Sequence, residues 1–407
     1  MSLGRFTTFK TARRGCGITI VATRQDFLQG GKKMSIKILV FPADLEACGH
    51  YRLIWPAMAM KEETDYDIRI ISPQDRGNTL LAEIDESDNV TKARCTVDAD
   101  VLVFQRLTHK YLSQAIPMFV KQGYHVIVDM DDDLEAISQT NPAWAVYHPK
   151  SGTRDVVAKH SWLHARDACK HASATTLSSV ALMERYGYQH GTVIRNFVPE
   201  HYLAVPRDDS TVIGWGGSMR SHAEDVPVMG NSIRRLMDKG YGFIQVGPPG
   251  GLKDALRLGD EPPSTGPVSM ENWATALAEN IGIGVAPLAT TKFNRAKSRL
   301  KPLEYASLGI PMVMSDVDEY RAFHDNFGVG LMARKPIDWY RKLKQMLDNE
   351  EYRLSQALFA REMAVGLTIQ ANIERWIKVW TPKKRRQRAT ALPGSALGVM
   401  STTIDHN

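Results

Sequence analysis

The sequence predicts an α/β protein with two doubly wound, Rossmann-like domains that face each other across a cleft. Two observations predict this fold class: short apolar runs alternate with helical stretches, and the alternation starts a second time near the middle of the chain. Continuous apolar runs of this length are typical of parallel strands that are covered on both faces. With 407 residues, of which 43% are hydrophobic, the chain is long enough to form two cores of ordinary domain size.

The first domain is expected to span residues 35–198. Its strands are predicted from apolar runs separated by turn-forming residues, with an amphipathic segment at 51–61 after the first of them. These strands are expected at residues 36–41, 68–71, 101–104, 126–128, 172–178 and 193–199.

The second domain is expected to span residues 199–368, where the same alternation is repeated. Four further strands are expected at residues 212–215, 243–247, 281–287 and 311–315. A final helix is predicted at 369–380, because apolar side chains recur there at helical spacing. At that spacing Trp376 and Trp380 are expected to pack in a core rather than to contact a ligand.

The two ends of the chain differ in composition from the rest. Residues 1–34 contain seven Lys or Arg against one Asp, and residues 381–407 contain five against one, so the remainder carries a net charge of −4. We expect 1–34 to be a disordered or non-native extension and 381–407 to be a disordered basic tail. Because the folded body is not basic, nucleic acid is not expected as its partner.

The composition also bears on where the protein acts. No apolar run approaches the ~20 residues that span a bilayer, and the four cysteines form no Cys-x-x-Cys pair, which indicates neither a zinc cluster nor a disulfide framework. Residues 30–33 would be encoded by purine-rich codons, as a bacterial ribosome-binding site is, so that translation would begin at Met34 of a bacterial or phage gene. We therefore expect a cytoplasmic protein, in the host cytoplasm if a phage encodes it.

The segment 297–316 is the most informative part of the chain. It reads as a cationic loop, a short helix and a buried strand, with the helix predicted to begin near Pro302 and to stop at Gly309. Such a junction between a loop and a helix start is a common anion-binding site, because the first N–H groups of a helix have no partner within it.

Charged side chains surround this predicted helix start. Lys297, Arg299 and Lys301 would lie beside the positive end of the helix dipole, an arrangement suited to phosphate oxygens. Glu304 falls in the first turn and is expected to accept hydrogen bonds from sugar hydroxyls. An ordinary solvated helix start is the alternative, with Glu304 merely complementing the dipole.

A glycine-rich loop follows the first strand of the second domain. Gly216 and Gly217 lack Cβ atoms, which would let backbone N–H groups approach a diphosphate closely, and Ser218 and Arg220 follow in the same loop. The ends of neighbouring strands in a doubly wound sheet converge on one crevice, so this loop and the cationic loop are expected to share a ligand. A tight turn without a ligand is the alternative.

Residues 301–316 resemble the donor-binding element of GT-B glycosyltransferases, in particular the retaining family-4-like group. The pattern of that group is Glu, seven residues, Glu, a helix of small residues, Gly-x-Pro and a hydrophobic strand, and Glu304 matches the second Glu. Ala296 stands where the first Glu falls. The nearest polar residues that could replace it are Asn294, Lys297 and Ser298.

Two further segments carry the resemblance. The stretch around Asn196 is similar to the connector between the two domains of these enzymes. The helix at 369–380 looks like the terminal helix that crosses back onto the first domain in GT-B enzymes. The resemblance covers most of residues 35–380, through motifs in the second half and through architecture in the first.

Four carboxylates follow the strand at 126–128, and like charges that crowd together are costly unless they are paired, protonated or bound to a cation. They are Asp129, Asp131, Asp132 and Asp133. Three functional interpretations remain open: an Asp-x-Asp metal and diphosphate site as in GT-A enzymes, the nucleophile and general acid of a phosphohydrolase, and a carboxylate that orients the acceptor in a GT-B enzyme. A solvated helix start is the fourth.

Two other loops of the first domain are expected to face the cleft. Arg52 and Arg106 lie in them and are candidates to bind a phosphate or carboxylate of the acceptor. The candidate bases are His50, His109 and His125, although a lone histidine is more often structural.

The resemblance implies transfer of a sugar, with retention, from a nucleotide diphosphate-sugar donor to a hydroxyl acceptor, with neither a metal nor another cofactor. The expected catalytic residues are Lys297 and Lys301, which would stabilise the departing diphosphate, and Asp131. The expected donor-binding residues are Gly216, Gly217, Ser218, Arg220, Ser298 and Glu304. The expected acceptor-binding residues are Arg52, Arg106, Asp129 and Asp132. The acceptor is expected to be a glycan, a lipid, a protein or a modified DNA base.

Two other classes of function remain open. A metal-dependent phosphohydrolase would be centred on Asp129 and Asp131. A catalytically inactive sugar-nucleotide-binding module is indicated by Ala296, which replaces the first Glu of the family pattern.

Overall fold

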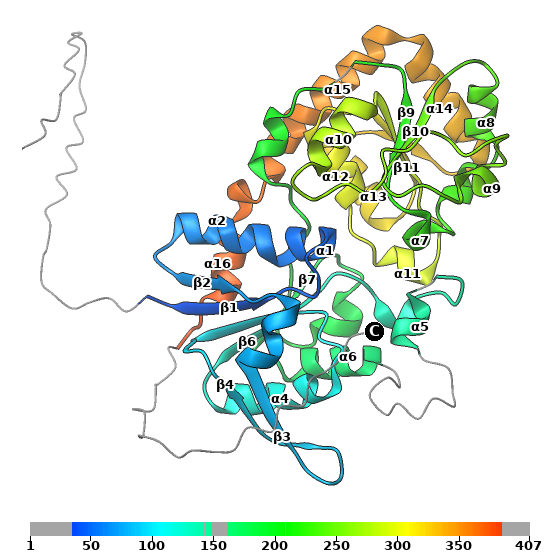
Figure 1. The fold of residues 1–407 in the computed structure, drawn as a ribbon. Helices are drawn as coiled ribbons and strands as arrows, with labels where there is room; N and C mark the ends of the chain where they lie inside the picture. The colour runs from blue at the N-terminus through cyan, green and yellow to red at the C-terminus, as the bar shows by residue number, and fades with distance from the viewer. Residues whose placement is uncertain (1–34, 142, 149–160, 208, 385–407) are drawn as a thin grey trace, which may run out of the picture. The chain divides into compact units, whose positions relative to one another are not determined.

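The computed structural model describes residues 35–141, 143–148, 161–207 and 209–384. The expected N-terminal extension and residues 385–407 of the expected basic tail lie outside these ranges. Two parallel sheets with their surrounding helices, and one two-stranded hairpin, make up the described part of the chain, as Figure 1 shows. The predicted α/β fold class with parallel sheets is confirmed.

The first sheet has six parallel strands in the order β2-β1-β5-β6-β7-β8. They are β1 (Lys37–Phe41), β2 (Asp67–Ile70), β5 (Val101–Gln105), β6 (His125–Met130), β7 (Ala174–Leu177) and β8 (Gly191–Val193). The accompanying α-helices are α1 (Ala47–Gly49), α2 (Trp55–Glu63), α3 (Arg76–Thr79), α4 (Lys110–Lys121), α5 (Trp144–Tyr147) and α6 (Ser161–His171). Short helical turns are η1 (His50–Ile54), η2 (Pro73–Asp75), η3 (Leu134–Ala136) and η4 (Met183–Gly187). Strands β1, β5 and β6 are buried along almost their whole length, which is why continuous apolar runs predicted them.

The second sheet has five parallel strands in the order β10-β9-β11-β12-β13. They are β9 (Ile213–Gly216), β10 (Phe243–Val246), β11 (Ile283–Ala286), β12 (Met312–Ser315) and β13 (Leu331–Ala333). The α-helices are α7 (Met219–His222), α8 (Ser232–Met237), α9 (Leu252–Leu256), α10 (Trp273–Asn280), α11 (Lys292–Arg295), α12 (Leu300–Ser307), α13 (Asp318–Phe327), α14 (Pro336–Asp348), α15 (Glu350–Ala364) and α16 (Glu374–Trp380). Short helical turns are η5 (Glu200–Ala204), η6 (Val226–Met229), η7 (Val365–Leu367) and η8 (Gln370–Asn372).

The structure differs from the sequence prediction at four strands. The antiparallel hairpin of β3 (Leu80–Ile84) and β4 (Val90–Cys95) was not predicted, because most of its side chains are exposed and leave no apolar run. Strand β13 was missed because it is only three residues long and two of them are partly exposed. The strand expected at 193–199 ends at Val193, and the chain continues as the connector between the two sheets.

The helix expected to begin near Pro302 begins two residues earlier. Helix α12 starts at Leu300, so Pro302 lies in its first turn, where a missing N–H costs nothing. Glu304 is therefore in the second turn rather than in the first. Gly309 follows the helix with φ of 67°, a left-handed conformation that glycine adopts readily at helix ends.

Helix α16 packs against the first sheet. The backbone oxygen of Val379 lies 2.8 Å from Nε2 of His125, the first residue of β6. Trp376 and Trp380 are 1% and 0% exposed, and Trp376 contacts Phe197 edge to face. The two tryptophans are core residues, as predicted. One hydrophobic core is continuous from this helix and the first sheet to the second sheet.

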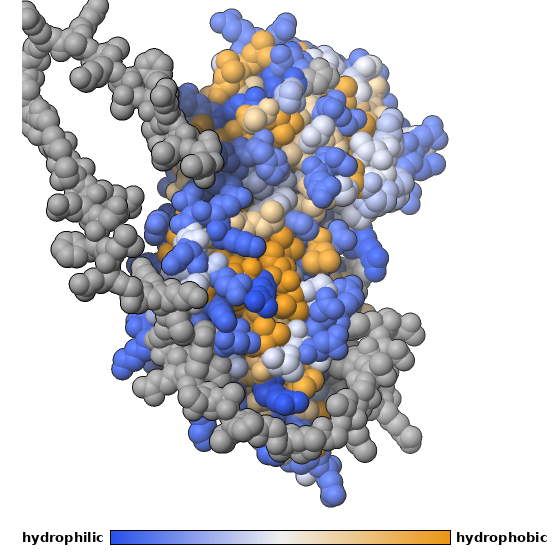
Figure 2. Space-filling view, turned by 60° about the vertical axis from the view of Figure 1, so that its left-hand side comes forward, coloured by the Kyte–Doolittle hydropathy of each residue, from blue (hydrophilic) through white to orange (hydrophobic). Residues whose placement is uncertain are grey.

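The surface carries both polar and apolar groups. Figure 2 shows hydrophobic residues gathered near the middle of one face, among hydrophilic ones. Within the described ranges, no helix has the length and apolar character that crossing a membrane requires.

Candidate functional site

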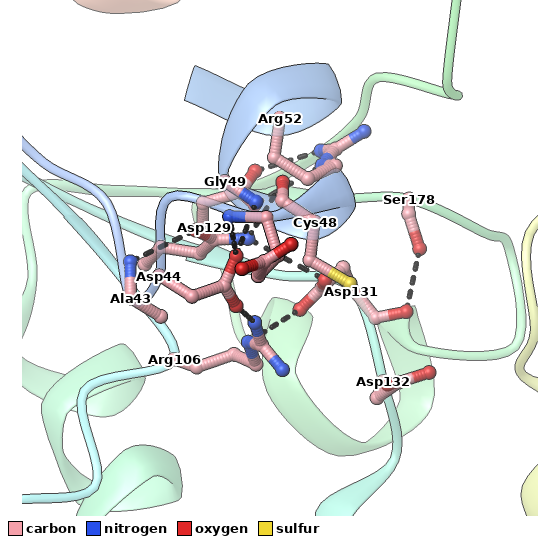
Figure 3. A network of polar contacts seen from close by, with 12 residues as sticks. Ala43, Asp44, Cys48, Gly49, Arg52, Arg106, Asp129, Asp131, Asp132 and Ser178 are labelled. Atoms are coloured by element: carbon pink, nitrogen blue, oxygen red, sulfur yellow. Dashed lines mark hydrogen bonds and ion pairs between the residues drawn. The ribbon is translucent and has the colours of Figure 1, made fainter. Parts of the chain in front are cut away.

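Polar side chains gather at the carboxyl ends of β1, β5 and β6, as Figure 3 shows. Because neighbouring parallel strands end at one edge of the sheet, residues far apart in the sequence meet there. Asp44 follows β1, Arg106 follows β5, and Asp131 follows β6. The Arg106 guanidinium bridges the two carboxylates: its Nε lies 3.2 Å from Asp131 Oδ1, and it donates a hydrogen bond to Asp44.

Arg106 has an unusual backbone conformation, with φ of 43°. A residue with a side chain in the left-handed region costs about 1–3 kcal/mol, and such residues are concentrated at functional sites. The Arg106 N–H donates to the Asp129 oxygen over 2.9 Å, which stabilises the turn. The arrangement brings the guanidinium, which is 13% exposed, over Asp131.

Two further groups complete this edge. Burial and the nearby Asp131 raise the pKa of the Cys48 thiol well above its ordinary value, so the thiol stays protonated. Burial also raises the pKa of the Tyr147 hydroxyl, against the opposing effect of Arg106. Neither residue was predicted from the sequence, because neither belongs to a recognisable motif.

Arg52 and Asp129 lie in the interior rather than on the cleft wall. Both are 0% exposed, and the guanidinium binds the carboxylate in a bidentate manner, with distances of 2.7 Å and 3.1 Å. Arg52 also donates to the Ile194 oxygen at 2.6 Å and to Asn196 Oδ1 at 2.9 Å, while Thr176 donates to Asp129 at 2.5 Å. The polar groups of this pair are directed at protein partners, so the expected acceptor contacts of Arg52 and Asp129 are replaced by a structural role.

Asn196 links this buried pair to the second domain. Its Oδ1 accepts from Arg52, and its Nδ2 donates to Ser298 Oγ over 2.9 Å. Ser298, which the sequence assigned to donor binding, therefore contacts the connector between the sheets.

The glycine-rich loop closes tightly onto the second sheet. The Gly216 N–H donates to the Tyr305 hydroxyl over 2.9 Å, and the Gly217 N–H donates to the Val246 oxygen, also over 2.9 Å. These two N–H groups are thus already bonded, contrary to their expected role toward a diphosphate. A Cβ at position 216 would lie 2.7 Å from Leu277 Cδ2, so the Leu277 side chain would have to shift to admit any other residue.

The rest of this loop starts helix α7. Ser218 is its N-cap, and its Oγ accepts from the Arg220 N–H over 3.3 Å. Arg220 is exposed at the surface of α7. The loop therefore presents the Ser218 hydroxyl and the Arg220 side chain, rather than the glycine N–H groups, as polar groups for a ligand.

Lys301 and Glu304 extend from α12 toward this loop. The Lys301 ammonium donates to the Gly216 oxygen, and burial lowers its pKa. Glu304 is 4% exposed, and burial raises the pKa of its carboxyl group. Its Oε1 accepts from the Tyr51 hydroxyl at 2.6 Å and from Trp273 Nε1 at 2.8 Å. Tyr51 and Trp273 are contacts that the sequence did not indicate.

Lys297 joins the two groups of residues. Its Nζ lies 2.9 Å from Asp132 Oδ1, so the cationic loop of the second domain meets the acidic cluster of the first. Burial acts to lower the pKa of Lys297, but Asp132 outweighs it and the pKa is raised. Next to this pair, Ser179 donates to the Ala296 oxygen over 2.7 Å. Arg299 points elsewhere, over the rings of Phe323 and Phe327.

His222 and Asp225 form a further pair near the lysines. His222 Nδ1 lies 2.7 Å from Asp225 Oδ2. His222 and Lys301 both pack on Trp215: the Trp215 and His222 ring centroids are 5.8 Å apart, and Lys301 Nζ lies 5.9 Å from the Trp215 centroid. Sequence analysis did not single out this pair, although the His-x-x-Asp spacing directly after the glycine-rich loop would have been a usable signal.

A separate open pocket of about 1290 Å³ lies between α6 and η4 of the first half and α11 and α13 of the second. None of the site residues expected from the sequence, all of which are described, lines it. Asp133 and Ala296 do line it, and they are the chain neighbours of the Asp132–Lys297 pair. The pocket therefore reaches the residues beside the point where the two halves of the predicted site meet.

The carboxylates of the phosphohydrolase alternative have cationic partners. Asp129 binds Arg52, and Asp131 binds Arg106. Among the described residues, no group of three or more His, Cys, Asp or Glu side chains is placed to hold a metal ion.

No protein-family model matches the chain, and no curated protein matches its sequence. Solved structures do match its fold. Sucrose-phosphate synthase from Thermosynechococcus elongatus is 9% identical with a TM-score of 0.56, over 84% of this chain and 98% of that one. The Anabaena protein HepE, in complex with UDP, is 12% identical with a TM-score of 0.55, over 85% and 98%. The catalytic domain of starch synthase IV from Arabidopsis thaliana, bound to ADP and acarbose, is 9% identical with a TM-score of 0.54, over 85% and 99%. The chain shares its two-domain α/β fold with these glycosyltransferases.

Proposed function

We propose that the chain is a glycosyltransferase that moves a sugar from a nucleotide diphosphate-sugar donor to a hydroxyl acceptor. The observation that carries this proposal is the grouping of basic side chains beside the Gly216 loop: Lys301 donates to the Gly216 oxygen, His222 and Lys301 both pack on Trp215, and Lys297 lies four residues before Lys301. Three groups that are or can become cationic, at the carboxyl ends of neighbouring parallel strands, suit a diphosphate. UDP and ADP in two structures of the same fold support this ligand class.

We assign the donor to the second domain. Lys297 and Lys301 would neutralise the charge that develops on the departing diphosphate, which is the largest contribution to rate in such reactions. To do so, each must exchange a present partner, Asp132 or the Gly216 oxygen, for a phosphate oxygen. Glu304 would accept from ribose hydroxyls, with its carboxylate oriented by Tyr51 and Trp273. Ser218 and Arg220 remain our candidates for further donor contacts.

We assign the reaction to the region around the Lys297–Asp132 pair, where the second domain contacts the acidic cluster of the first. Asp131 and Asp132 would orient the acceptor hydroxyl, with Arg106 holding Asp131 in place. Since the lysines supply the positive charge at the diphosphate, we propose metal-independent transfer. We also propose retention, in which the departing diphosphate itself accepts the proton of the acceptor.

A panel of nucleotide sugars tests this function. We expect the full chain to release nucleoside diphosphate from at least one of them and to retain that activity in excess chelator, because no divalent ion would be needed. Activity that chelation abolishes and Mn²⁺ or Mg²⁺ restores would contradict the mechanism. Release of inorganic phosphate from phosphate esters would favour the phosphohydrolase, and tight nucleotide binding without release would favour the inactive binding module.

We further propose that the acceptor enters through the pocket between α6, η4, α11 and α13. A bulky side chain in this pocket would then obstruct the acceptor and not the donor. Ala181 lines the pocket and is exposed, so Ala181→Trp is expected to raise the KM for the acceptor roughly tenfold or more. Nucleotide affinity, measured by calorimetry, should stay unchanged.

The matched control for this substitution is Ala82→Trp. Ala82 is also exposed but lies in the β3–β4 hairpin, and Trp there should change neither quantity. Equal acceptor KM values for the two variants would place the acceptor outside this pocket.

A further inference from the structure

His222 is held in one orientation by a carboxylate. It is the last residue of α7, and its Nδ1 lies 2.7 Å from Oδ2 of Asp225, which is 3% exposed. Burial acts to raise the pKa of Asp225, but the contact with His222 and other hydrogen bonds lower it overall, so Asp225 is an ionised acceptor. A carboxylate only accepts, so the proton of neutral His222 is on Nδ1, and Nε2 carries the lone pair.

Asp225 is itself fixed by the second domain. Its Oδ1 accepts from the Ala289 N–H at 2.9 Å and from Asn294 Nδ2 at 2.6 Å. Asn294 was a candidate to replace the missing first Glu of the donor motif, but it is 5% exposed and bound to Asp225. Asn294 therefore orients the His222–Asp225 pair.

The imidazole faces charges of both signs. Burial is the largest influence and lowers the pKa of His222; the ammonium groups of Lys301 and Lys297 lower it further, while Asp225 raises it. The Trp215 ring packs edge-on against it, 5.8 Å between centroids. His222 nevertheless keeps 19% of its side chain exposed. Because its pKa is lowered from the ordinary value of histidine, His222 is neutral near pH 7 while the site holds no anion.

We propose that His222 takes up a proton from solvent when the diphosphate of the donor binds, and that its Nε2–H then hydrogen-bonds the diphosphate beside Lys297 and Lys301. This inference rests on the donor site proposed above. An anion bound next to the ring favours the imidazolium, while Asp225 stabilises the added charge from the other nitrogen. The third cation is thus present only with the donor, so the free enzyme does not hold three repelling charges together.

Calorimetry on the full chain tests this proposal. Nucleoside diphosphates are titrated at pH 7.5 in buffers of different ionisation enthalpy, which yields the number of protons taken up on binding. The nucleotide's own terminal phosphate also titrates, with a pKa of about 6, so the comparison is between the parental chain and His222→Gln. We expect the number of protons taken up on binding to be smaller in His222→Gln than in the parental chain by roughly half a proton or more.

The pH dependence of affinity gives a second readout. In the parental chain the Kd should increase as pH rises. The increase should be up to about tenfold per pH unit between the pKa values of free and bound His222. This dependence should be lost in His222→Gln and kept in His164→Gln. His164 is a matched control, since burial lowers its pKa too but it lies in α6 of the first half.

The outcomes separate this inference from the proposed function. If no nucleoside diphosphate binds the parental chain, the donor site and this inference both fail. If a nucleoside diphosphate binds the parental chain without proton uptake and with a Kd that does not increase as pH rises, the donor site stands and the His222 inference is overturned. This outcome does not depend on whether His222→Gln folds.

Discussion

Replacing Asp129 with asparagine is expected to lower the free energy of unfolding by about 3–5 kcal/mol, because it leaves the Arg52 guanidinium buried without its counter-charge. Both side chains are 0% exposed, so water cannot compensate. Arg52 also binds the Ile194 oxygen and Asn196, so the loss should loosen the connector as well as the first sheet. Urea denaturation followed by circular dichroism measures the effect.

Glu83→Gln is the control for this prediction. Glu83 forms an ion pair with Lys92 in the β3–β4 hairpin, and the two side chains are 57% and 73% exposed. Exposed pairs of this kind contribute about 0–1 kcal/mol, so Glu83→Gln should be close to neutral. If Asp129→Asn were equally neutral but impaired use of the acceptor, the functional assignment of Asp129 would return.

The buried strands were predictable and the hairpin was not, for one physical reason. A strand covered on both faces must be apolar throughout, and the runs that became β1, β5, β9, β11 and β12 have this character. Strands β3 and β4 are mostly exposed, so their composition is that of a loop. Strand predictions from apolar runs therefore find the parallel sheets and miss what lies outside them.

The candidate site was predictable only where sequence neighbours stay spatial neighbours. Lys301 and Glu304 both lie on α12, which keeps them together, and Lys297 is three residues before this helix. Arg52 and Asp129 are far apart in the chain, and the sequence could not reveal that each would be the other's partner rather than a ligand's. Charge and position after a strand predicted that both residues would be near the sheet edge, but not that they would be buried there.

Lys301→Ala and Glu304→Gln are each expected to lower sugar transfer by at least about tenfold, since a charge-assisted contact contributes ~1.5–3 kcal/mol. Lys301→Ala removes a charge from the diphosphate site, and Glu304→Gln removes the carboxylate charge while keeping an oxygen for Tyr51 and Trp273. Initial rates with the donor identified by the nucleotide-sugar panel provide the measurement.

The control for these two variants is Lys378→Ala, an exposed lysine of α16, which should retain the parental rate. A thermal melt separates lost chemistry from lost folding, because Lys301 also binds the Gly216 oxygen and its removal loosens the loop. If Lys301→Ala lost both stability and rate while Glu304→Gln kept the parental rate, α12 would serve to hold the loop. Folded variants that both transfer sugar at the parental rate would mean that the donor binds elsewhere. A rate that falls in both folded variants, together with weaker nucleotide binding in Lys301→Ala, is what a diphosphate held at the start of α12 requires.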